Sequence, residues 1–185
     1  MIVKQRRNVG LGPSLVAAID AFVLANGSAR SEEVVRLVDL GLSAKRQPPL
    51  RTDCYLSENT RSEDGGTVTV YASSSWWSGI DERARRYGEN ISELVRALIH
   101  GGLTIGDSAP PVRESIERVE AAMGHRAWRP GELAREVWGE AHALAFSGHS
   151  GAYAVRRALD LLEASGRVFR ALDGKWERGA KPSAR

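Results

Sequence analysis

The stretch GTVTVYASSSWW, residues 66–77, decides how the first half of the chain is expected to fold. Polar or aromatic side chains at positions 67, 69 and 71 alternate strictly with apolar ones at positions 68, 70 and 72. A period of two predicts a β-strand over residues 67–72 with one buried face. A helical pattern follows at once, so this strand needs a partner from elsewhere in the chain.

A similar pattern opens the chain. Val9 and Leu11 alternate with a row formed by Lys4, Arg6, Asn8 and Gly10, which predicts another strand. A helix is expected to begin near Pro13, because proline suits a first helical turn. Gly27 is expected to end it, and Ser31 to cap a second helix.

Residues 67–103 repeat this plan. The strand is followed by a helix that Gly88 ends and by a second helix that Ser92 caps. From the last strand residue to the helix-ending glycine the separation is 16 residues in both stretches, Leu11 to Gly27 and Ala72 to Gly88. The sequence therefore predicts an internal repeat, with a first copy at residues 3–42 and a second copy at 67–103.

A strand–helix–helix unit of about 40 residues has too small a core to stand alone. Two units solve this by pairing their strands into a two-stranded antiparallel ribbon with four helices behind it. We expect the pairing within one chain, since a tether raises the effective concentration of the second strand. Asn8 would then lie opposite Thr69, and Arg6 near Tyr71. Pairing of like copies between two chains is the alternative.

Both copies resemble the ribbon-helix-helix family of DNA-binding proteins, and the segment NISELVRALI, residues 90–99, is similar to that family's second helix. The resemblance implies that outward strand residues enter a major groove, which admits a two-stranded β-ribbon. The residues carried over are Lys4, Arg6, Asn8 and Gly10 in the first copy and Thr67, Thr69 and Tyr71 in the second. Backbone amides at Ser31 and Ser92 would contact phosphates.

Residues 112–178 follow a different plan. Helices are expected over 112–124, 129–138 and 151–165, followed by a hairpin that turns at Asp173-Gly174. The segments GELAREV, AVRRALDLLEASGRV and DGKWER resemble the winged helix-turn-helix superfamily. The resemblance implies that the third helix enters a major groove and that the hairpin contacts the DNA backbone. The implied contacts are Tyr153, Ala154, Arg156 and Arg157 on the helix and Arg170 and Lys175 on the hairpin. A module that docks another protein is the alternative.

The expected fold class is mainly α with short β. The first copy occupies 1–43, the second 67–103 and the winged helix 112–178, with linkers at 44–66 and 104–111 and a tail at 179–185. Both linkers are rich in Pro, Gly, Ser and Asp.

The composition excludes several function classes. The 185 residues carry 26 Lys and Arg against 23 Asp and Glu, a net charge of +3, so any nucleic-acid contact depends on placed residues. One cysteine fits a reducing cytoplasm, and no apolar run reaches the roughly 18 residues of a membrane span. His142 and His149 lack metal-ligand spacing, and no glycine-rich phosphate loop is present. We expect no cofactor, no metal and no catalytic residue.

The sequence therefore predicts a cytoplasmic, nucleoid-associated protein that binds double-stranded DNA sequence-specifically, most simply as a transcriptional repressor. An accessory factor in replication, partition or transfer of a mobile element would use the same binding. A protein-interaction adaptor is the alternative of another class.

Overall fold

The structure, a computed structural model, describes residues 4–43, 66–105, 112–139 and 150–179. These form two compact units: residues 1–20 with 30–108, and residues 21–29 with 109–185. The described residues are mainly helical and contain two small antiparallel sheets of two strands each. No helix among them is both long and apolar enough to span a bilayer.

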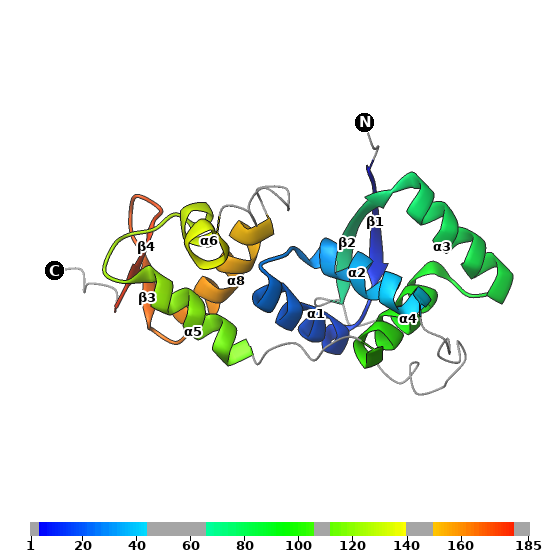
Figure 1. Cartoon of the computed structure of the whole chain (residues 1–185), viewed down its shortest axis with the longest axis horizontal. Helices are drawn as coiled ribbons and strands as arrows, with labels where there is room; N and C mark the ends of the chain where they lie inside the picture. The colour runs from blue at the N-terminus through cyan, green and yellow to red at the C-terminus, as the bar shows by residue number, and fades with distance from the viewer. Residues whose placement is uncertain (1–3, 44–65, 106–111, 140–149, 180–185) are drawn as a thin grey trace. The chain divides into compact units, whose positions relative to one another are not determined.

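The first unit is built on a β-ribbon. Its elements are β1 (Lys4–Gly10), α1 (Pro13–Asn26, of which the first part belongs here), α2 (Arg30–Ser43), β2 (Thr67–Ser73), α3 (Ser74–Tyr87) and α4 (Ile91–Ile105). The strands β1 and β2 lie side by side (Figure 1) and pair antiparallel, with Asn8 opposite Thr69 and Arg6 opposite Tyr71. The register expected for pairing within one chain is confirmed.

The internal repeat is visible in the element bounds. Adding 61 to the first residue of α1 or α2 gives the first residue of α3 or α4, and α1 and α3 are both 14 residues long. Gly27 and Gly88, also 61 apart, follow α1 and α3 with φ of 64° and 70°. Only glycine adopts this left-handed conformation without strain, which is why both helices end there.

The helices α2 and α4 cross at very short range because each carries a glycine at the crossing. A Cβ atom on Gly41 would lie 2.1 Å from the carbonyl oxygen of Leu98, and one on Gly102 would lie 2.1 Å from that of Leu37. The two contacts are equivalent, because adding 61 to Gly41 gives Gly102 and adding 61 to Leu37 gives Leu98. The two copies are thus related by an approximate two-fold axis, and the fully buried Leu37 and Leu98 form the core between them.

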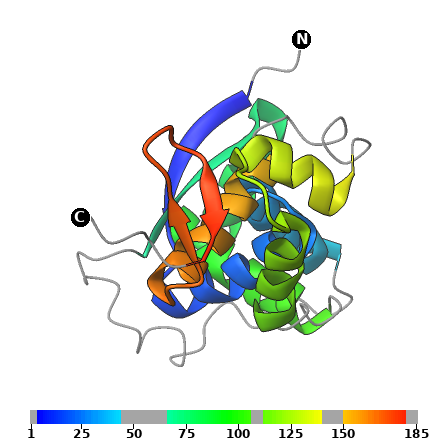
Figure 2. The same ribbon diagram turned by 90° about the vertical axis from the view of Figure 1, so that its left-hand side faces the viewer.

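Among the described residues that follow position 111, the second unit packs three helices against a hairpin. Its elements are α5 (Val112–Met123), α6 (Pro130–Trp138), α8 (Ser150–Ala164), β3 (Val168–Arg170) and β4 (Trp176–Arg178). Figure 2 shows the hairpin in orange and red beside α8, which packs on β3. The core of this unit consists of buried apolar side chains, chiefly Leu24, Val119, Met123, Trp128, Leu133, Val155, Leu159, Leu162, Val168 and Trp176.

Trp128 extends the hairpin by one residue. Its backbone exchanges two hydrogen bonds with Trp176, at 2.9 Å and 2.8 Å, and its buried indole donates to the carbonyl of Met123 at 2.6 Å. The segment before α6 therefore holds β4 in place.

Helix and strand bounds agree with the expected ones to within two residues, with one difference of consequence. The helix α4 continues through Thr104 and Ile105, which were expected to begin a linker. The Thr104 hydroxyl donates to the carbonyl of Gly101 and so satisfies a polar group in the last turn. The rest of that linker, residues 44–65 of the first linker and residues 180–185 of the tail lie outside the described residues.

The crossing of α2 and α4 yields a stability prediction. Gly41→Ala and Gly102→Ala should each destabilise the protein by about 1–3 kcal/mol or more, because the new methyl group meets backbone atoms that have no room to move. Gly79→Ala, within α3 and with nothing within 4 Å of its Cβ position, is the matched control. It should stabilise by up to about 1 kcal/mol. Urea unfolding midpoints measure all three, and equal effects would contradict the close crossing.

Candidate nucleic-acid interface

The outer face of the β1–β2 ribbon collects all seven strand residues that the sequence analysis selected. Lys4, Arg6, Asn8, Thr67 and Tyr71 are exposed, while Gly10 and Thr69 are half-buried. The apolar residues that alternate with this row, Val9, Val68, Val70 and Ala72, turn inward and are buried. The ribbon therefore presents one row of cationic, amide, hydroxyl and phenol groups on a rigid two-stranded support.

A hydrogen bond ties the two strands together at the middle of this row. The Thr69 hydroxyl donates to Asn8 Oδ1 at 2.9 Å. That bond uses one lone pair of Oδ1 and orients the Asn8 amide, whose two Nδ2 protons can donate to a ligand. The two side chains are thus preorganised as a unit.

Arg7 holds the inner face of the ribbon to α3. Its guanidinium donates two hydrogen bonds to the Asp81 carboxylate, at 2.6 Å and 2.9 Å, and lies 4.8 Å from the centroid of the Trp77 ring. The hydrogen bond from Arg7 lowers the pKa of Asp81, partial burial opposes this, and the positive charge of Arg7 adds to it. The same bond raises the pKa of Arg7. Sequence reasoning missed this pair, since 74 residues separate its members.

The capping role expected for the hydroxyls of Ser31 and Ser92 is wrong. Neither caps its helix: each hydroxyl accepts a backbone amide from the opposite copy's strand, Ser31 from Tyr71 at 2.7 Å and Ser92 from Gly10 at 3.2 Å. Asn90 caps α4 instead, accepting from the amide of Glu93 at 2.9 Å. The amides of Tyr71 and Gly10 lie at the edge of the strand pairing. By accepting hydrogen bonds from them, the two serines attach the ribbon to the N-termini of α2 and α4.

The N-terminus of α2 carries less negative charge than its sequence implies. Glu33 is buried, with 2% of its surface exposed, and pairs with Arg36 at 2.7 Å one turn further along. Glu32 is half-buried. A carboxylate at a helix N-terminus would repel a phosphate there. The charge of Glu33 is neutralised by Arg36 within the helix, which leaves Glu32.

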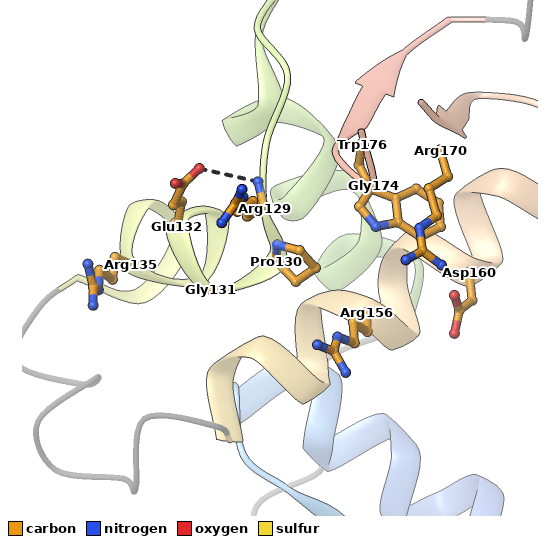
Figure 3. Close-up of a pocket in the computed structure, with 10 residues that line it drawn as sticks. All are labelled: Arg129, Pro130, Gly131, Glu132, Arg135, Arg156, Asp160, Arg170, Gly174 and Trp176. Atoms are coloured by element: carbon orange, nitrogen blue, oxygen red, sulfur yellow. Dashed lines mark hydrogen bonds between the residues drawn. The ribbon is translucent and has the colours of Figure 1, made fainter. Parts of the chain in front are cut away.

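A basic pocket of about 580 Å³ lies in the second unit between the start of α6, α8 and the hairpin (Figure 3). Four arginines line it: Arg129, Arg135, Arg156 and Arg170. Glu132 and Asp160 are the acids of the lining, so the pocket has a formal excess of two positive charges. The N-terminus of α6 adds its helix dipole, which favours an anion.

Half of these arginines were predicted from the sequence to contact DNA. Arg156 and Arg170 were selected and line the pocket, whereas Arg129 and Arg135 were missed because only folding brings α6 to the hairpin. Pro130, which marks a helix start, was the available signal, since arginines flank it on both sides.

The remaining selected residues of this unit stand apart from the pocket lining. Tyr153 and Arg157 are half-buried on α8. Ala154 is fully buried and cannot contact DNA, because it lies on the inward stripe of α8 with Val155 and Ala158. Lys175 pairs with Asp173 at 3.1 Å. The pKa of the Asp173 carboxyl is lowered mainly by the hydrogen bond from the Lys175 backbone amide, and to a smaller extent by the one from the Lys175 side chain.

Within the ranges that the structure describes, no three His, Cys, Asp or Glu side chains gather in a geometry that could hold a metal ion. The ribbon of the first unit thus offers an exposed row of hydrogen-bonding groups, and the pocket of the second unit offers cationic groups to an anion.

The pair of Arg7 and Asp81 yields a pH prediction. Asp81→Asn should destabilise the first unit by about 1 kcal/mol at neutral pH, because it removes a bidentate, charge-assisted pair. The native pKa of Asp81 lies below its ordinary 3.8, so the pair stabilises above pH 3.8 and this contribution is lost as the pH falls through the native pKa. Unfolding curves of wild type and variant should therefore converge in acid.

Glu82→Gln is the control for that measurement. Glu82 is the next residue on α3, is 65% exposed and pairs with Arg86 at 2.9 Å. Its loss should change stability little at any pH. A gap between wild type and Asp81→Asn that stays constant down to pH 2 would contradict the role given to Arg7.

Comparisons with known proteins assign no family to this chain. No protein-family model matches it, and no curated protein or solved structure is significantly similar to it. The function must therefore be inferred from the site itself.

Proposed function

We propose that this chain is a sequence-specific double-stranded DNA-binding protein, with a tandem ribbon-helix-helix region followed by a winged helix. The observation that carries the proposal is the exposed row on the β1–β2 ribbon, anchored from behind by Arg7 and the two serines. A two-stranded β-ribbon fits the width of a major groove. The element order of the second unit, three helices and a hairpin, supports the winged-helix part.

The side chains of the row suit base edges. Arginine pairs bidentately with guanine, asparagine can donate to the N7 acceptor of adenine, and threonine offers a hydroxyl and a methyl group to thymine. Arg6, Asn8 and Thr67 supply these groups, and the rigid ribbon holds them at strand spacing. The ribbon therefore reads sequence.

The cationic pocket suits phosphate. Arg156 on α8 and Arg170 on β3 face one space with Arg129 and Arg135 (Figure 3), and guanidinium groups bind phosphate oxygens in pairs. Phosphate contacts add affinity and set the register without reading sequence. The two units thus divide specificity and affinity between them.

A protein with this division of labour acts most simply by occupying an operator as a transcriptional repressor. A DNA-binding accessory factor in replication, partition or transfer of a mobile element would need the same contacts. Footprinting across the protein's own upstream region separates the two roles: protection over a promoter supports repression, and protection over repeated sites near an origin supports maintenance. Protection nowhere, with the second unit binding a protein, would support an adaptor.

The salt dependence of binding tests the proposal. Arg156→Ala and Arg170→Ala should each weaken binding to specific and random duplexes about equally, and each should reduce the slope of log affinity against log salt by about 0.9. Arg113→Ala is the matched control, since Arg113 is 87% exposed on α5 and does not line the pocket. Affinities of the wild type and the three variants, measured from low to moderate salt, give the slope for each protein. A salt-insensitive affinity, or no binding to any duplex at low salt, would overturn the proposed function.

A further inference from the structure

We propose that the ribbon reads a non-palindromic site, with a cationic end that specifies one half and a neutral end that specifies the other. The inference rests on the proposed function and deepens it, because it assigns different bases to the two ends of one ribbon. The cationic end carries Lys4 and Arg6 of β1. The neutral end carries Gly10 of β1 and Thr67 of β2.

The scaffold beneath the row is close to two-fold symmetric. The contacts of Gly41 with Leu98 and of Gly102 with Leu37 exchange under the 61-residue shift. The hydrogen bonds from Tyr71 N to Ser31 and from Gly10 N to Ser92 exchange in the same way. Symmetric backbones of this kind present equivalent positions to the two halves of a DNA site.

The centre of this symmetry is the Asn8–Thr69 pair. These two residues are opposite each other in the register and are also 61 apart, so each is the other's equivalent. The approximate axis must pass between them. Asn8 and Thr69 therefore face the middle of the site, and the pairs on either side of them face its two halves.

The side chains on the two sides of that axis differ. Toward one end Arg6 lies opposite Tyr71, and Lys4 opposite Ser73. Toward the other end Gly10 lies opposite Thr67. The first end carries two cations and a phenol that is 49% exposed, while the second offers only a hydroxyl, a methyl group and bare backbone. A symmetric backbone thus carries an asymmetric reading row.

Each end suits different bases. Arg6 favours guanine through its O6 and N7 acceptors. Thr67 favours thymine, by contact with the methyl group, and tolerates other bases through its hydroxyl. The central pair presents the Asn8 amide protons, oriented by the bond that Oδ1 accepts from Thr69, and so favours a base with an acceptor at the middle of the site.

Selection of the full-length chain on a randomised duplex is the first test. The wild-type protein should select a non-palindromic motif. Arg6→Ala should relax base preference in one half only and weaken binding to the best site roughly 5- to 150-fold. Thr67→Ala should relax preference only in the other half. A palindromic motif, or relaxation of both halves by either variant, would overturn the inference while DNA binding stood.

A symmetrised variant is the second test. Arg6→Thr, Asn8→Thr and Gly10→Tyr, made in a Lys4→Ala background that removes the remaining cation of the row, together give the first copy the reading row of the second. The site at Gly10 has room, because a Cβ there lies 3.9 Å from its nearest neighbour, Ser92 Oγ, and tyrosine favours strands. Circular dichroism and the urea midpoint confirm that the symmetrised variant is folded.

The symmetrised variant should select a palindrome, because each end of its ribbon then presents one threonine opposite one tyrosine. Retention of the wild-type motif by the folded variant would show that the row does not set the sequence, and would overturn the inference. Absence of binding to any duplex by the wild-type chain would overturn the proposed function itself, which distinguishes the two failures.

Discussion

The pairing of β1 with β2 is the interaction on which the first unit depends. Within the described residues neither strand pairs with any other, so each leaves its backbone groups unsatisfied without its partner. Pairing places the apolar residues of both strands on one face, where Val9, Val68 and Val70 are buried. It also brings Ser31 and Ser92 to the strand amides that they bind. The close approach of α2 and α4 then holds the two copies from behind.

Much of this could be predicted from the sequence, because alternation of side chains fixes which face of a strand is buried. Alternation, together with a tether between the copies, was enough to place Asn8 opposite Thr69. The glycine that ends each first helix was equally clear, since a left-handed residue has few alternatives to glycine.

The errors have physical causes of three kinds. Arg7 occupies an inward position that the pattern reserves for an apolar residue, and only its distant partner Asp81 makes that position tolerable. Ser92 lies near a helix start but uses its hydroxyl on a strand, which local capping rules do not consider. The pocket arginines come from α6, α8 and the hairpin, so their convergence depends on tertiary packing that no local pattern encodes.

The intramolecular ribbon has a consequence for how occupancy depends on the amount of protein. When a ribbon is assembled from two separate chains, dimerisation precedes binding, and at low concentration occupancy rises with the square of the total protein. Here both strands belong to one chain, so the ribbon forms in a first-order folding step. Under the proposed function, occupancy of a single DNA site would then rise with the first power of concentration. A DNA-binding protein built in this way would respond gradually to its own abundance and would act at copy numbers at which a dissociating dimer is mostly monomer.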